Sequence, residues 1–289
     1  MKISPLTKQL ITERFLKTLI RAPSKFNLPP SSMRIALEQM CKLFPQDKTV
    51  QIRSLRLAGL RAEEIKPQQE STQLIFHIHG GAFYLGSLNT HRAFMTQIAA
   101  RTQMQVLHVD YPLSPESAYP EALEALFDVY HLLLDQGVQA KDIILSGDSC
   151  GANLALALAL KIQHENLPQV SGLILLSPLL DLTLTSESLR YNQKHDALLS
   201  LETVQTGIEY YVPRSIDRGD PEVSPFFADL AGLPPIHIQV GSKEILLDDA
   251  SRFKEKAEQA GVEVNLNSIP ACGTTSRCSV PGSMKPNRR

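Results

Sequence analysis

The sequence contains no tryptophan, no closely spaced cysteine pair and no long uncharged hydrophobic run. The four cysteines, at positions 41, 150, 272 and 278, form no CxxC motif, which argues against a metal cluster or a disulfide scaffold. Residues 1–20 are interrupted by Lys8, Glu13, Arg14 and Lys17, so they lack the apolar core of a signal peptide or membrane span. We therefore expect a cytoplasmic protein with no metal, no cofactor and no membrane span.

The chain also lacks a charge excess. It carries 29 Lys and Arg against 30 Asp and Glu, for a formal net charge of −1. Nucleic-acid and anionic-membrane binders normally carry a clustered cationic excess, so neither partner is expected. With 43% hydrophobic and 20% charged residues in 289, the chain can bury a large core. We expect one domain with a cap, and leave the oligomeric state open.

Short aliphatic runs alternate with helical periodicity through the middle of the chain. The expected strands are Leu74–His79, Gln105–Asp110, Asp142–Ser146, Val170–Leu176 and Ile236–Val240. The expected helices between them are Leu88–Thr102, Pro120–Gln136 and Gly151–Glu165. This alternation predicts an α/β fold with a mostly parallel central sheet and helices on both faces.

Three segments depart from this alternation. Residues 1–50 have helical periodicity, broken at Pro29 and Pro30, and predict N-terminal cap helices. Within a catalytic domain over residues 51–289, the polar stretch 181–229, with a helix at Leu201–Tyr211, predicts a cap insertion that packs with them. Residues 271–289 lose all hydrophobic periodicity and read as a disordered or non-native tail.

The motif Gly147-Asp148-Ser149-Cys150-Gly151 stands directly between an expected strand and an expected helix. A serine on such a turn projects its hydroxyl, the flanking glycines allow close approach of neighbouring chain, and the helix N-terminus offers N–H groups to a developing oxyanion. An ordinary glycine-rich βα turn is the alternative, but the strand–turn–helix context favours a nucleophile.

A second motif, His79-Gly80-Gly81-Ala82, lies at the carboxyl end of the expected strand Leu74–His79. Glycines after a strand expose backbone N–H groups of the kind that an oxyanion hole requires. A helix-capping loop with a buried histidine is the alternative. We interpret His79 as a residue that organises the loop by hydrogen bonding.

Four segments, HGGAFYLGS, DYPLSPESAYP, GDSCGANLA and GSKEILLDD, resemble in order and spacing the hormone-sensitive-lipase-like family of α/β-hydrolases. The likeness runs from about Leu74 to Leu266. It implies a carboxylesterase acting on small, short-chain acyl esters, with Ser149 as nucleophile and the amides of Gly80, Gly81 and Cys150 as oxyanion donors. It also implies that the cap segments cover the acyl pocket.

The same resemblance matches the family's catalytic acid to Glu244, with Asp248 as the runner-up. Either carboxylate could orient an imidazole. The acid belongs at the carboxyl end of a strand, just after IHIQVGS, which favours Glu244.

A catalytic histidine is expected after the acid, yet the last of the eight histidines is His237. Residues Ala271–Ser279 can be encoded as GCA TGT GGC ACG ACT TCG CGC TGT TCA. Read from the third base, that string gives M-W-H-D-F-A-L-F, which resembles the family's histidine segment and places the base near position 274. The sequence therefore favours a frameshift or a sequencing error in the tail.

Two other functions remain open from the sequence. Some relatives, such as plant gibberellin receptors, keep the hydrolase pocket, lose the base and bind a ligand without turnover. A related acyl-transfer or amide-hydrolysing activity could use the same machinery. The retained HGGA and GDSCG motifs favour the esterase.

Overall fold

The structure is a computed structural model that describes residues 28–270. Its centre is an eight-stranded sheet with the order β1-β2-β4-β3-β5-β6-β7-β8. The strands are β1 Gln51–Leu57, β2 Leu60–Lys66, β3 Leu74–Ile78, β4 Gln105–Val109, β5 Ile143–Asp148, β6 Gly172–Leu176, β7 Ile236–Gly241 and β8 Val264–Ile269. The β1–β2 and β2–β4 pairs are antiparallel, and the pairs from β4 to β8 are parallel. This confirms the expected α/β-hydrolase architecture.

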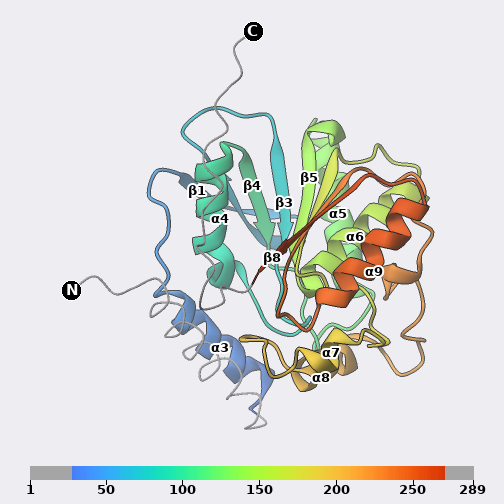
Figure 1. Cartoon of the computed structure of the whole chain (residues 1–289). Coiled ribbons are helices and arrows are strands. Elements are labelled where there is room, and N and C mark those ends of the chain that lie inside the picture. Colours follow the sequence, from blue (N-terminus) through green and yellow to red (C-terminus); the bar gives the residue numbers. More distant parts are fainter. Residues whose placement is uncertain (1–27, 271–289) are drawn as a thin grey trace.

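Helices cover the sheet in two layers (Figure 1). α4 (Leu88–Thr102) packs on β2 and β4, where Met95 and Ala99 share a buried cluster with Ile65 and Val106. α5 (Glu121–Asp135) packs on α6 (Cys150–His164), which covers β3, β5 and β6, while α9 (Leu247–Gln259) covers β7 and β8. Strand alternation therefore sends one row of side chains to α4 and the other to the α5–α6 layer.

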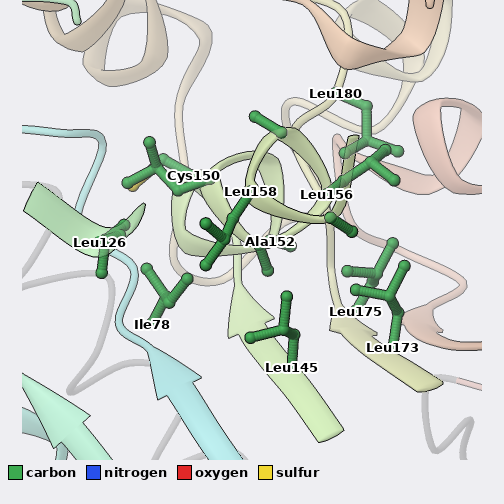
Figure 2. Close-up of a cluster of buried hydrophobic side chains, with 14 of the residues drawn as sticks. Ile78, Leu126, Leu145, Cys150, Ala152, Leu156, Leu158, Leu173, Leu175 and Leu180 are labelled. Atoms are coloured by element: carbon green, nitrogen blue, oxygen red, sulfur yellow. The ribbon is translucent and has the colours of Figure 1, made fainter. Parts of the chain in front are cut away.

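The main core lies between α6 and the sheet. Figure 2 shows Ala152, Leu156 and Leu158 of α6 above Leu145 of β5 and Leu173 and Leu175 of β6, and each of these side chains is at most 1% exposed. Alanine alternates with leucine along this helix, so its backbone approaches the strands closely. The helix is buried almost all round, which fixes the position of its first residue relative to the sheet.

Helices occur in both segments for which the sequence predicts a cap. α3 (Pro30–Cys41) comes from the N-terminal segment, and α7 (Ser188–Tyr191), α8 (Leu201–Tyr211) and the 3₁₀ turn η2 (Pro225–Phe227) come from residues 181–229. Figure 1 shows α3, α7 and α8 gathered at one end of the molecule. α3 and α8 share a cavity of about 170 Å³ around Tyr84. The rest of the predicted N-terminal helices, and the predicted disordered tail 271–289, lie outside the described residues.

Four elements were not expected from the sequence. β1 and β2 form a hairpin through Ala58 and Gly59, both with positive φ, and β8 closes the opposite edge. All three are polar or exposed along much of their length, and α9 buries only Asp249, Ala250, Phe253 and Ala257. Edge elements carry few buried side chains, so their hydrophobic pattern is weak.

Among residues 28–270, no helix is both long and apolar enough to cross a membrane.

Candidate active site

Ser149 lies on the sharp turn between β5 and α6, with φ 54° and ψ −121°. A left-handed φ is costly for a residue that carries a side chain, so the surrounding chain must hold it there. A Cβ at Gly147 would come within 2.2 Å of the Gly151 carbonyl oxygen, and one at Gly151 within 2.1 Å of the Ile78 carbonyl oxygen. Both flanking glycines are therefore required by close backbone approach.

The backbone of Ser149 is tied to the strand beside it. Its N–H donates to the Leu176 carbonyl over 2.8 Å, and its carbonyl accepts from Leu179 N over 3.2 Å. Parallel register places the carboxyl ends of β3, β5, β6 and β7 at one edge of the sheet. The loops that follow these strands, including the HGGA and Glu244 loops, meet at this edge.

The HGGA loop runs from β3 past the Ser149 turn. Gly81, Ala82 and Phe83 all have positive φ, at 131°, 51° and 65°. The Gly80 N–H donates to Asp148 Oδ1 over 2.9 Å, and a Cβ at Gly80 would fall 2.2 Å from Asp148 Oδ2. The Gly80 N–H, which the resemblance implied as an oxyanion donor, thus binds a carboxylate in this structure and joins the loop to the Ser149 turn.

Asp148 collects histidines from two other elements. His77 Nε2 on β3 lies 3.2 Å from Asp148 Oδ1, and His91 Nε2 on α4 lies 3.4 Å from the same oxygen. His79, 1% exposed, stacks on Tyr111 with ring centroids 4.4 Å apart and on His91 at 5.3 Å. Its Nδ1 lies 2.9 Å from the Gly80 carbonyl oxygen. Its place is thus inside the loop's support, away from any reacting atom.

Burial and the contact between Asp148 and His91 shift the pKa values in this cluster. Burial opposes ionisation of Asp148, but the charge of His91 and hydrogen bonds from His77 and His91 outweigh it and hold the Asp148 pKa well below its usual range. Burial also disfavours charge on His91, but Asp148 outweighs it and raises the His91 pKa. Burial, with the charge of His91, lowers the pKa of His79 to about 3, and burial lowers that of His77. Asp148 and His91 therefore each favour the charged form of the other, while burial favours the neutral forms of His77 and His79.

Glu244 lies in the loop between β7 and α9, at the same carboxyl end of the sheet as Ser149. Its Oε1 accepts the Gly241 N–H over 2.7 Å, and its carboxylate also binds the Ser177 hydroxyl. Ser177 directly follows Leu176, whose carbonyl holds the Ser149 N–H. Burial, together with the charge of Asp196, raises the pKa of Glu244 despite those two hydrogen bonds.

Asp248 has a different environment on the first turn of α9. Its Oδ2 accepts the Ser188 N–H over 2.7 Å, and its Oδ1 accepts the Tyr191 hydroxyl over 2.8 Å. Both partners belong to α7. Asp248 therefore links two helices, which favours Glu244 as the acid.

None of the eight histidines contacts Glu244 in the described structure. His77, His79 and His108 are buried on the α4 side of the sheet, and His91 on α4 is partly buried. His131 and His164 lie exposed on α5 and α6. His237 is the second residue of β7, at the end of the strand away from the Glu244 loop. His195 is exposed in the cap, next to Asp196, whose carboxylate accepts the Ile245 N–H. The predicted segment near position 274 lies outside the described residues.

Known proteins share much of this sequence and its fold. Residues 75–273 match the family described as the alpha/beta hydrolase fold. An esterase from Acinetobacter venetianus is 65% identical over 266 residues, covering 92% of this chain and 88% of that protein. An acetyl-hydrolase from Streptomyces hygroscopicus is 33% identical over 72% of this chain and 70% of its own length.

Solved structures agree. A crystal structure of an esterase from the bacterial hormone-sensitive lipase family matches with TM-score 0.84 and 31% identity, covering 93% of this chain and 89% of its own. A hormone-sensitive lipase from a metagenome library matches with TM-score 0.83 and 35% identity over 89% and 87%. The chain belongs to the hormone-sensitive-lipase-like family of α/β-hydrolases. It is a carboxylic ester hydrolase, as the resemblance implied.

Sequence reasoning missed two supports of this hydrolase site, His77 and His91. His77 was hidden inside an apolar strand, and His91 inside a predicted helix. Two positions before His79, His77 must face the same side of β3 as His79 would in a continued strand, which was a usable signal. No pattern in the sequence predicted that His91 on α4 would face Asp148.

Proposed function

We propose that this esterase hydrolyses short-chain acyl esters through Ser149, with Glu244 as the triad acid. The observation that carries the proposal is the strained turn at Ser149, held between Gly147 and Gly151 at the head of α6. Strain at a single non-glycine residue persists only where the fold requires it, and it is typical of reactive centres.

The proposed reaction has two halves. Ser149 Oγ attacks the ester carbonyl carbon while a histidine accepts its proton, and the carbonyl oxygen becomes an oxyanion. The carbon–oxygen bond to the alcohol then breaks, and the alcohol leaves with that proton. Water attacks the acyl-serine by the same route, giving the carboxylic acid and free Ser149.

We assign the oxyanion donors to the amides of Gly81 and Cys150. Cys150 is the first residue of α6, so its N–H has no carbonyl four residues earlier in the helix to bind. The positive end of the α6 dipole adds to that donor. Gly81 follows Gly80 in the anchored loop, and its φ of 131° suits a residue without a side chain.

For the base, we propose the histidine that the alternative reading frame places near position 274. β8 ends beside the acid loop, because the Ile269 carbonyl accepts the Ser242 N–H over 2.9 Å. The segment that carries a histidine a few residues after Ile269 would thus begin near Glu244. Sequencing the gene across codons 265–289 tests this directly, and an in-frame CGTTSRC in an active enzyme would direct attention to His195 instead.

Substitution of the nucleophile tests the proposed function. Ser149→Ala should abolish hydrolysis of a chromogenic butyrate ester, and an organophosphate should label wild-type Ser149 alone. Ser215→Ala, at an exposed serine of the cap, is the matched control and should keep full activity. Activity near the wild-type level in folded Ser149→Ala would rule out this serine as the nucleophile.

We further propose that acyl chains of about two to eight carbons are preferred, because α7 and α8, the described helices of the predicted cap insertion, are short. A profile of kcat/KM against acyl length measures this. Steady increase up to sixteen-carbon esters, with activation by emulsified substrate, would indicate a lipase.

A further inference from the structure

The two residues on either side of Ser149 each bind an amide of the HGGA loop. Asp148 Oδ1 accepts the Gly80 N–H over 2.9 Å, and Cys150 Sγ accepts the Phe83 N–H over 3.1 Å. The loop is thus attached at both ends of the Gly80–Phe83 segment. Gly81, which we assign as an oxyanion donor, lies between the two attachments.

The Cys150 thiol is buried, neutral and hydrogen-bonded on two sides. The residue is fully buried, and burial raises its pKa to about 12, so it stays a neutral thiol. A side-chain hydrogen bond joins it to the Tyr111 hydroxyl, whose own proton goes to the His79 carbonyl over 2.8 Å. Because a hydroxyl has one proton, the thiol donates in the Cys150–Tyr111 bond. Cys150 therefore accepts from one residue of the loop and is linked through Tyr111 to another.

The loop needs such support because its own conformation is unfavourable. Ala82 and Phe83 both have left-handed φ, at 51° and 65°. Each such residue costs free energy that surrounding contacts must offset. The Phe83 ring stacks on Tyr211 of α8 with centroids 3.9 Å apart, and the Phe83 carbonyl accepts the Ser114 N–H over 3.0 Å. The Cys150 sulfur is the partner of the Phe83 N–H on the nucleophile side.

We propose that Cys150 is a positioning residue, whose side-chain sulfur works with the Asp148 carboxylate to hold the Gly80–Phe83 loop in register with Ser149. This role belongs to the side chain and is separate from the backbone amide assigned to the oxyanion. The consequence for catalysis rests on the proposed function, whereas the anchoring itself does not.

The first test measures the anchor without activity. In the full chain, the Phe83 amide should exchange with deuterium about tenfold faster in Cys150→Ala than in wild type, as expected for loss of one hydrogen bond. Cys150→Ser, whose hydroxyl can accept from Phe83 and donate to Tyr111, should restore slow exchange. Cys41→Ala, at the other cysteine of the described residues, is the matched control. The Leu85 amide, bound to Gly81 O over 2.8 Å within the loop, is the internal reference.

The second test separates positioning from packing. With a chromogenic ester, Cys150→Ala should lower kcat by about tenfold and change KM by less than about twofold, and Cys150→Ser should recover most of kcat. If a chain that carries the proposed base hydrolyses no ester, the proposed function fails, and the exchange measurement still decides the anchor. Unchanged Phe83 exchange in Cys150→Ala overturns the inference. If the alanine variant does not fold, fast Phe83 exchange in folded Cys150→Ser overturns it equally.

Discussion

Glu244 and Asp248 are four positions apart but contact different parts of the molecule, which makes them separable by substitution. Glu244→Gln should lower kcat by up to about 10⁴-fold, because an amide neither orients an imidazole correctly nor supports its charge. Asp248→Asn should leave kcat within about threefold and lower stability by about 1 kcal/mol, through weaker bonds to Ser188 and Tyr191. Steady-state kinetics and urea unfolding of both variants measure this.

A larger loss of kcat in Asp248→Asn would reverse the assignment of the acid. Comparable losses in both variants would mean that α7 and α9 together shape the site. The two substitutions remove the same charge, so each serves as the other's control.

The candidate site was predictable where its chemistry depends on local sequence. The GDSCG motif between a predicted strand and a predicted helix identified the turn at Ser149. The HGGA motif after a predicted strand identified the loop. Both structures require glycine at the end of a strand, which the sequence shows directly. The hydrogen bond from the Gly80 N–H to a carboxylate 68 positions away was not predicted. Such a contact depends on β3–β5 register, and no local pattern in the sequence encodes it.

At the scale of elements, α8 touches the HGGA loop through a glycine. A Cβ at Gly207 would lie 2.2 Å from the Ala82 carbonyl oxygen. Alanine in a helix interior normally gains about 1 kcal/mol over glycine, but overpacking here should cost about 1–3 kcal/mol and displace α8 or the loop. We expect Gly207→Ala to lower both the unfolding midpoint and kcat.

Gln205→Ala, at an exposed position of the same helix, is the control and should affect neither quantity. A Gly207→Ala variant that is more stable and fully active would show that α8 does not bear on the loop.

Glu63 connects β2, α4 and β4. It binds Arg92 through both oxygens, with its closest contact at 2.5 Å, and lies 3.1 Å from His108 Nε2. Burial alone would raise its pKa, but the hydrogen bonds from His108 and Arg92 and the charge of Arg92 lower it to about 2. A carboxylate with a depressed folded pKa stabilises the fold above its unfolded pKa, and this contribution disappears as pH falls toward the folded value.

We therefore expect Glu63→Gln to cost about 1–2 kcal/mol at pH 7, after allowance for solvent screening at Arg92, and the deficit to shrink between about pH 4.5 and pH 2. Urea unfolding across that range measures it. Glu64→Gln, at the next position of β2, is the control, because Glu64 pairs with the exposed Arg53. A deficit independent of pH would indicate lost packing.

The elements predicted from sequence were those with complete hydrophobic patterns. α4 and α8 have the expected bounds, and β3 to β7 differ from expectation by at most two residues at an end. β8 was missed because its burial is only partial along the strand, and α9 because charged residues surround a narrow apolar stripe at positions 250, 253 and 257. A hydrophobic repeat arises from buried positions, so it does not predict an element that is largely exposed to solvent.

At the scale of the whole molecule, the sheet face that carries α4 is covered unevenly. Beyond α4, Ile144, Ile174 and His237 line a hollow of about 270 Å³. A chain rebuilt in the alternative frame after residue 270 should cover part of this face, and should unfold at higher urea concentration with a larger m-value. It should also gain esterase activity over the 289-residue chain. Equal midpoints and equal activities for the two chains would contradict the frameshift proposal.

The parallel pairing of β7 with β8 has a practical consequence. Register runs from Ile236↔Val264 to Gly241↔Ile269, so the last described strand delivers the chain to the edge that holds Ser149 and Glu244. Any segment joined after Ile269 therefore begins next to the loop that carries Glu244, whatever its sequence. The chain can therefore serve as an acceptor scaffold, in which libraries of short cassettes joined after residue 270 are selected for those that supply the proposed base.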